Sequence, residues 1–336
     1  MKSLIGLVAI IALSVSVIAA TPPGMGAASF ARRGMDARPI AMGGAFVAVA
    51  EGGSACYYNP AGLGQETRIS VGGMYTEPFG EGFGTTFQYL NAVGSFNLQT
   101  SSAVARVGLG VTWLGLTISD IPTWEEGGPG EMFTATSSVY LLSAGIPFPD
   151  TNDWSVGASV KVYRDKILEG HSLGVGFDLG VLGSFSVGEI PFQIGLNSMD
   201  VGRTKVYWHG TSGEPVNYVP WINKVGLSLG LLDNVVLITS DLDWAVGRPM
   251  REQILHVGLE LRPLNAISVR AGWNGDLERT GSSITAGVGI YLFDSLSIDY
   301  AYVTAKVFGA SHLVSVHFAF DIDMEPVTPS REQNSE

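Results

Sequence analysis

The feature that most constrains this chain is an alternation of apolar residues with small or polar ones, which recurs in short segments from about Arg68 to Asp321. In residues 255–261, for example, Leu or Val occupies every second position, and His, Gly and Glu fill the positions between them. A period of two residues is typical of β-strands, because successive side chains of a strand point to opposite faces. The pattern therefore predicts many strands with one fully apolar face.

The composition excludes two other classes of protein. Hydrophobic residues make up 46% of the 336 residues and charged residues only 15%, and a disordered chain could not keep so much apolar surface in water. Away from the extreme N-terminus, no run approaches the roughly 18 to 20 apolar residues that a membrane-spanning helix needs. The 44 glycines also disfavour helices. We therefore expect an all-β protein.

Turn signals divide residues 67–320 into about fourteen candidate strands, an even number as in single-chain bacterial barrels. Tight connections alternate with longer polar ones in the second half, as periplasmic turns and external loops do. A soluble β-sandwich would also explain the alternation, but not the aromatic residues that collect near strand ends. We therefore predict a transmembrane antiparallel β-barrel of about 14 strands. The predicted external loops include residues 119–131, 199–217, 274–281 and 305–311.

The two ends of the chain predict export to the outer membrane. Residues 1–20 combine a basic residue, an apolar stretch and a small-residue end, as a secretory signal peptide does, with an N-terminal anchor helix as the alternative. The last strand ends in Phe318 and Phe320, like the signal that the outer-membrane barrel insertion machinery reads. Residues 321–336 form a polar tail that we expect in the periplasm. Outer-membrane lipids would surround the barrel.

Charge and motifs argue against several functions. The net charge of −12 disfavours nucleic acid and anionic lipid headgroups as partners. Cys56 is the only cysteine, so we interpret it as a small buried apolar residue. Residues 226–230 have the spacing of a hydrolase nucleophile elbow, but they lie within an alternating strand instead of a strand–turn–helix. The histidines show no metal-ligand spacing. We expect no enzyme activity, no metal and no cofactor.

A glycine-rich segment, residues 21–66, lies between the signal peptide and the first strand, and we interpret it as a hatch. It contains Ala-Met-Gly-Gly-Ala-Phe at 41–46 and Cys-Tyr-Tyr-Asn-Pro-Ala-Gly-Leu at 56–63. Glycines allow turns and close packing, and Asn-Pro favours a turn. These strings resemble the N-terminal signature of the PorV/PorQ family, which is grouped with the FadL-like outer-membrane transport proteins. The candidate hatch motif is Gly43, Gly44, Asn59, Pro60 and Gly62.

The resemblance implies a 14-stranded barrel whose N-terminal segment folds into or under the lumen. It leaves the function open, because FadL-like proteins take up hydrophobic molecules, whereas PorV serves type IX secretion by handling exported cargo. We expect passage or capture of hydrophobic molecules, with a shift of the hatch around Asn59 and Pro60 that opens a route. The alternatives are a secretion-associated barrel that binds secreted protein cargo or a partner channel, and a structural plug without ligand contact.

Charged residues on the small-residue face of the strands are nearly balanced in sign. Charges in a lumen must be paired or hydrated, so the balance favours an internal ion-pair network over a ring selective for one sign of ion. The cations are Arg68, Arg106, Lys161, Lys224 and Arg270, and the anions are Asp178, Asp241, Asp243, Glu260 and Asp299.

The predicted external loops carry apolar and aromatic residues. On mobile loops such residues could capture an amphipathic molecule or contact another protein, and they could also simply extend the outer aromatic belt. These candidate contact residues are Phe79, Phe83, Trp124, Tyr207, Trp208 and Phe308.

Overall fold

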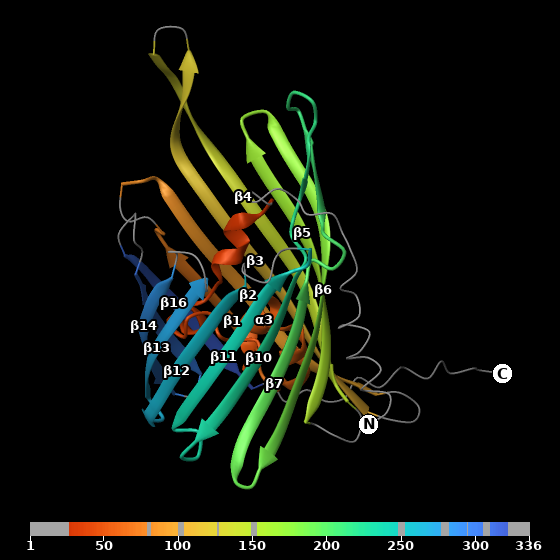
Figure 1. Ribbon diagram of the computed structural model, residues 1–336, viewed down its shortest axis with the longest axis vertical. Coiled ribbons are helices and arrows are strands. Elements are labelled where there is room, and N and C mark those ends of the chain that lie inside the picture. Colours follow the sequence, from red (N-terminus) through yellow and green to blue (C-terminus); the bar gives the residue numbers. More distant parts are fainter. Residues whose placement is uncertain are drawn as a thin grey trace, which may run out of the picture.

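The computed structural model describes residues 27–78, 82–99, 104–125, 128–148, 153–247, 253–276, 282–293, 295–304 and 310–321. Its strands form one antiparallel sheet that closes on itself, because the last strand, β16, pairs with the first strand, β1. Figure 1 shows the barrel with the helical turns of the N-terminal segment inside it. Among the described residues, no helix is long and apolar enough to cross a membrane.

Fourteen of the described strands make up the wall, and each pairs with the wall strands that precede and follow it, so the prediction of a 14-stranded transmembrane β-barrel is confirmed. The wall strands are β1 (Ile69–Thr76), β2 (Thr85–Gln99), β3 (Val104–Glu125), β4 (Gly128–Pro147), β5 (Trp154–Ile167), β6 (Gly170–Val187), β7 (Ile190–Met199), β10 (Ile222–Leu231), β11 (Val236–Ala245), β12 (Ile254–Leu264), β13 (Ile267–Asp276), β14 (Ser283–Leu292), β15 (Leu296–Val303) and β16 (Ser311–Phe320).

Strand β6 shows how the alternating sequence builds this wall. Its outward residues Leu173, Val175 and Phe177 are 51%, 50% and 52% exposed, whereas Gly174 and Asp178 are buried toward the lumen. Apolar side chains on the outside of a closed barrel are stable only where lipid replaces water. The outward phase therefore meets the membrane, and the inward phase is free to pack against whatever fills the barrel.

The prediction of an external loop at 119–131 is wrong. Strand β3 continues to Glu125 and β4 begins at Gly128, so this stretch forms the end of a long hairpin that projects beyond the rest of the wall (Figure 1). Asp120 has a positive φ and lies at a register shift, beyond which Ile121 pairs with Phe133. The turn-forming residues are thus absorbed as a β-bulge, and continued pairing satisfies the backbone N–H and C=O groups.

The predicted loop 199–217 also contains strands. They are β8 (Lys205–His209) and β9 (Val216–Tyr218), which pair with each other. Strand β6 pairs with β7 as far as Leu179 and Ser198, and beyond that point it pairs with β8. The β8–β9 hairpin therefore continues the wall where β7 ends.

Residues 27–66, called the hatch below, lie inside the barrel (Figure 1). Met35, Phe46 and Leu63 of the hatch are at most 1% exposed, so the core of the protein is the contact between hatch and wall. The predicted signal peptide and residues 322–336 of the predicted tail lie outside the described residues. The helical turns of the hatch are η1 (Ser29–Arg33), α2 (Ala37–Ala41), η2 (Gly52–Ser54), α3 (Ala55–Tyr58) and η3 (Pro60–Gln65).

Ten glycines of the described wall make room for the hatch. A Cβ placed on any of them would come closer than 3.0 Å to a hatch atom; on Gly157 it would meet Pro60, and on Gly195 the carbonyl of Val47. Only glycine permits such a close approach of two backbones. The inward glycines of the sequence thus act as a seat, called the glycine girdle below. The girdle consists of Gly108, Gly110, Gly145, Gly157, Gly180, Gly195, Gly226, Gly258, Gly272 and Gly287.

Candidate ligand cavity and its hatch

The hatch divides the lumen into two cavities. The upper cavity opens toward the end of the barrel that carries the β3–β4 hairpin, has a volume of about 540 Å³ and is bordered by Ser29 and Tyr58 of the hatch. The lower cavity has a volume of about 990 Å³ and is bordered by Arg38, Glu51 and Glu66 of the hatch. No described hatch residue lines both cavities. The hatch is therefore the floor of one cavity and the ceiling of the other.

One side of the upper cavity is apolar. Phe87 of β2, Leu114 of β3 and Leu141 of β4 line it, and each is at most 3% exposed. Phe30 of the hatch packs edge-on against Phe87, with ring centroids 6.4 Å apart. A concave apolar surface with a few polar groups at its margin is the usual form of a small-molecule site. This side suits the apolar body of a ligand.

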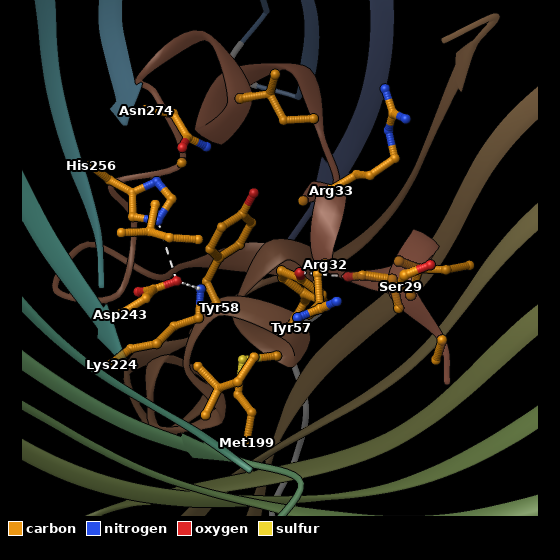
Figure 2. Close-up of a pocket in the computed structure, with 18 of the residues that line it drawn as sticks. Ser29, Arg32, Arg33, Tyr57, Tyr58, Met199, Lys224, Asp243, His256 and Asn274 are labelled. Carbon is orange, nitrogen blue, oxygen red and sulfur yellow. Dashed lines mark hydrogen bonds and ion pairs between the residues drawn. The ribbon is translucent and has the colours of Figure 1, made fainter. Parts of the chain in front are cut away.

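The opposite side of the upper cavity, formed by β10 to β13, is polar. Lys224 Nζ lies 2.6 Å from Asp243 Oδ2, which in turn lies 3.2 Å from His256 Nε2. Figure 2 shows these three side chains together at one side of the cavity. His256 Nδ1 also lies 2.7 Å from the carbonyl oxygen of Gly43, so the same cluster touches the hatch.

A second ion-pair cluster lies where β6 parts from β7. Lys161 Nζ is 2.8 Å from Asp178 and 3.2 Å from Asp200. The Tyr163 hydroxyl donates to Asp200 at 2.8 Å, and the backbone N–H of Asp200 donates to Asp178 at 2.9 Å. Sequence reasoning missed Asp200, because that residue follows β7 in a stretch whose sequence predicts an exposed loop.

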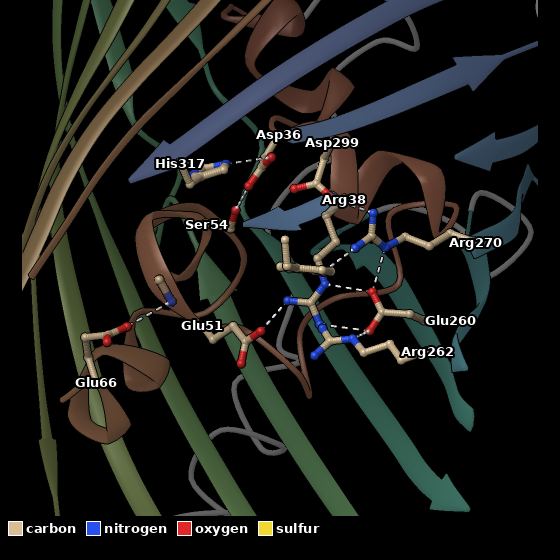
Figure 3. Close-up of polar contacts among 12 residues, drawn as sticks. Asp36, Arg38, Glu51, Ser54, Glu66, Glu260, Arg262, Arg270, Asp299 and His317 are labelled. Atoms are coloured by element: carbon tan, nitrogen blue, oxygen red, sulfur yellow. Dashed lines mark hydrogen bonds and ion pairs between the residues drawn. The ribbon is translucent and has the colours of Figure 1, made fainter. Parts of the chain in front are cut away.

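Glu260 is the centre of the lower charge cluster (Figure 3). Its carboxylate lies 2.6 Å from Arg270, 2.8 Å from Arg262 and 2.9 Å from Arg38. Arg270 also lies 2.6 Å from Asp299, which closes a network across β12, β13 and β15. Arg38 comes from the hatch, so the ion pairs of the wall also bind the hatch. A basic residue in the buried α2 was the signal that could have revealed this link.

Three residues of the predicted hatch motif, Asn59, Pro60 and Gly62, are buried. Asn59 Nδ2 donates to the carbonyls of Val47 and Val181, each at 3.0 Å, and Asn59 Oδ1 accepts from the N–H of Ala61 at 3.2 Å. Asn59 thereby caps η3, whose first residue is Pro60. A Cβ on Gly62 would overlap the carbonyl of Ala50. Hydrogen bonds to strand β6 of the wall and within the hatch therefore both hold this part of the hatch in place.

Gly43 and Gly44 form the turn that follows α2. Both have positive φ angles, +69° and +84°, which favour glycine. The N–H of Gly43 donates to Thr285 Oγ1 at 3.0 Å. The next residues are held by Asp241, whose Oδ2 accepts from the N–H groups of Phe46 at 2.6 Å and Val47 at 2.8 Å. Asp241 thus serves the hatch backbone, where the sequence suggested an ion-pair partner.

Asp36 of the hatch is a further buried charge that sequence reasoning did not identify. Its carboxylate lies 3.0 Å from His317 Nε2 of β16 and accepts a hydrogen bond from Ser54. Burial alone would raise the pKa of Asp36, but His317 and the hydrogen bonds hold that pKa well below its usual range. Burial also raises the pKa of the Cys56 thiol, in keeping with a packing role.

Two predicted lumen cations lie apart from these clusters. Arg106 donates to the carbonyl of Gly64 at 3.0 Å, and Arg68 lies 3.1 Å from Asp321 at the lower rim.

Ser228, the residue at the centre of the elbow-like pentapeptide, lies within β10 and donates to Gln193 at 3.1 Å. No strand–turn–helix surrounds it. The described residues hold no group of three or more potential metal ligands.

None of the predicted external contact residues that the structure describes lines the upper cavity. Phe83 is 59% exposed, Trp124 is 81% exposed at the end of the β3–β4 hairpin, and Tyr207 and Trp208 lie on β8. The structure therefore distributes them over separate elements. Phe79 and Phe308 lie outside the described residues. The residues that border the cavity are instead inward-facing strand residues and hatch residues.

Comparison with known proteins identifies the fold. No family model and no curated protein sequence matches the chain. Among solved structures, the Ralstonia pickettii toluene transporter TbuX shares 15% identity over 85% of this chain and 97% of its own, with a TM-score of 0.55. The deltaS2S3 mutant of TodX, a monoaromatic hydrocarbon channel, shares 14% identity over 86% and 99%, with a TM-score of 0.52. The likeness shows a FadL-like barrel fold; no match supports the PorV/PorQ assignment.

Proposed function

We propose that this chain is an exported outer-membrane barrel that captures hydrophobic or amphipathic small molecules in the upper cavity and mediates their passage. The observation that carries the proposal is the 540 Å³ cavity with an apolar side above the hatch. TbuX is named a toluene transporter and TodX a monoaromatic hydrocarbon channel, and a ligand of that class matches Phe87, Leu114 and Leu141. In this proposal the upper cavity faces the outside of the cell.

Passage requires part of the hatch to move. The sequence predicts a shift around Asn59 and Pro60, but the contacts favour movement of residues 28–34. The region around Asn59 and Pro60 is locked by the glycine girdle and by the Asn59 hydrogen bonds. Residues 28, 29 and 31–34 border the cavity directly, and the contacts of this segment include Ala27 N–H to the Tyr218 carbonyl at 3.1 Å and the Tyr57 hydroxyl to the Ala31 carbonyl at 2.6 Å. We place the first ligand-driven movement there.

Filling the apolar side of the cavity tests the proposal, and two adjacent residues of β4 provide a matched pair. Leu141 points into the cavity and is 3% exposed, whereas Leu142 points to lipid and is 60% exposed. We expect Leu141→Trp to weaken binding of a fluorescent naphthylamine probe by at least about tenfold, and Leu142→Trp to leave it unchanged. Equal binding by both variants and the wild type would refute the cavity as the site.

The secretion role is the second candidate, and the hatch strings at 41–46 and 56–63 favour it through their resemblance to PorV/PorQ. Under this alternative, deletion of the gene would trap surface proteins inside the cell, and the barrel would co-purify with a partner channel. Under the transport proposal, deletion would instead reduce uptake of hydrophobic compounds. Measuring both phenotypes in one deletion strain separates the two roles.

A further inference from the structure

The outward face of the wall carries a group of cations at the upper end of β5, β6 and β8. On β5 the outward residues change from apolar, at Val160 and Val162, to basic, at Arg164 and Lys166. Lys205 projects outward from β8. The cationic patch, as it is called below, consists of Arg164, Lys166 and Lys205, with the exposed imidazoles of His171 and His209 beside them.

Strand pairing brings the patch together. Lys166 pairs with His171 across β5 and β6, and His171 pairs with His209 across β6 and β8, with the two imidazole rings 5.7 Å apart. Residues paired across antiparallel strands have Cβ atoms about 4.5–5.5 Å apart. Arg164 and Lys166 lie two positions apart on the outward face of β5, about 7 Å along the strand, so one multivalent anion can reach both.

These three cations differ from the others in having no partner. The side chains of Arg164, Lys166 and Lys205 make no hydrogen bond or ion pair with any residue that the structure describes. Every other described Lys or Arg has a partner, such as Glu260 for Arg270 or the carbonyl of Gly64 for Arg106.

Few carboxylates offset the patch. Glu214 lies 3.7 Å from His209, and Glu169 is exposed on the turn between β5 and β6. Asp165 points the other way and accepts from Ser172 at 2.6 Å. Exposed cations that are left without a protein partner are available to an external anion.

We propose that the cationic patch binds the phosphate groups of an anionic lipid in the outer leaflet. The patch begins where the lipid-facing apolar residues of β5 end, which is the level of the headgroups, and Lys and Arg near an anionic membrane surface bind it favourably. Arg also holds phosphate in a bidentate geometry. The chain's net charge of −12 argued against such a partner, but a lipid meets only the outer face of the wall. This inference rests on the proposed outer-membrane location and not on the cavity.

Native mass spectrometry of the mature protein in detergent tests this, with bisphosphorylated lipid A and a dephosphorylated lipid A of the same acyl chains as probes. We expect the wild type to bind the bisphosphorylated form at least about tenfold more tightly. The triple variant R164Q/K166Q/K205Q should lose this preference, whereas Arg164→Lys should keep it. Arg68→Gln, at the lower rim, is the control for loss of positive charge elsewhere.

Two results would overturn the inference: equal affinity of the wild type for both lipids, or an unchanged preference in the triple variant. Heat-modifiable gel migration verifies that the triple variant is folded, as expected for substitutions at exposed positions. Binding of the fluorescent probe in the upper cavity is measured on the same samples and should not change. Failure of the lipid site and failure of the proposed transport function therefore give different results.

Discussion

Polar side chains of the wall hold the hatch by its backbone. Ser315 Oγ accepts from the N–H of Ala37 at 2.6 Å, and Asn197 Nδ2 donates to the carbonyl of Tyr58 at 2.8 Å. Asp241 accepts two N–H groups with one oxygen. A buried backbone group that loses its partner costs about 1–3 kcal/mol, so each of these side chains is a discrete contribution to hatch docking.

Removal of the Asp241 carboxylate should loosen the hatch. Asp241→Ala leaves the N–H groups of Phe46 and Val47 without acceptors, at about 1–3 kcal/mol each. Cys56 is the only cysteine and is buried in the hatch, so its rate of maleimide labelling reports hatch opening. We expect that rate to rise at least about tenfold. Ser240→Ala on the same strand is the control, and a labelling rate equal in both variants would contradict the assignment.

Loss of the Glu260 charge should destabilise the whole barrel. Glu260→Gln leaves Arg270 and Arg38 buried without their main counter-charge, and breaking a buried ion pair in this way costs about 3–5 kcal/mol. The temperature at which the folded gel band converts to the unfolded one should fall. Glu131→Gln, an exposed change on the β3–β4 hairpin, should leave that temperature unaltered.

Whole elements are fitted to each other through the glycine girdle. The turn η3 packs against β3 to β6, and α2 packs against β13 to β16. Girdle glycines lie opposite η3 on β3 to β6 and opposite α2 on β13 and β14, where hatch atoms occupy the space of the missing Cβ atoms. The strands are therefore shaped by the hatch on one face and by lipid on the other.

A side chain introduced into the girdle should displace η3. Gly157→Val places carbon atoms where Pro60 and Ala61 lie, whereas Ala158→Val on the same strand points to lipid. We expect the hatch of the Gly157 variant to become sensitive to added protease, with the strands still protected. The Ala158 variant should resist protease like the wild type. Protection of the hatch from protease in both variants would show that the wall accommodates a side chain at residue 157 without displacing η3.

The wall could be anticipated from the sequence because its pattern is local. Alternation over a few residues decides which side of β6 faces lipid, and it predicted about fourteen strands, the number that the wall has. The hatch contacts could not be anticipated from the sequence. Asn59 and Val181 are separated by 122 positions, and no local pattern near either residue predicts that the two are in contact. The β3–β4 hairpin was missed because Asp120 resembles a loop residue, and bulges are not visible in a period of two.

At the scale of the whole molecule, the hatch lies between two cavities that share none of its described residues. A barrel with this arrangement should behave unlike a general porin, in which the lumen is a water-filled channel. The hatch also borders the upper cavity, so under the proposed function selectivity and sealing would depend on one segment.

Electrical recording checks the sealing role directly. The purified wild type in a planar lipid bilayer should carry no steady current in potassium chloride, because the hatch interrupts the water path. The Gly157→Val variant should show long-lived open events, and the Ala158→Val variant should not. A steady porin-like current through the wild type would mean that the lumen is open despite the hatch.

The placement of the hatch contacts also sets an order of assembly. The turn η3 contacts β3 to β6 and α2 contacts β13 to β16, so half of these contacting strands are synthesised long after the hatch itself. The wall around the hatch is closed only when β1 and β16 have paired. We therefore expect the hatch, which is synthesised before the wall, to complete its contacts last. A docked hatch would then indicate that the barrel has closed.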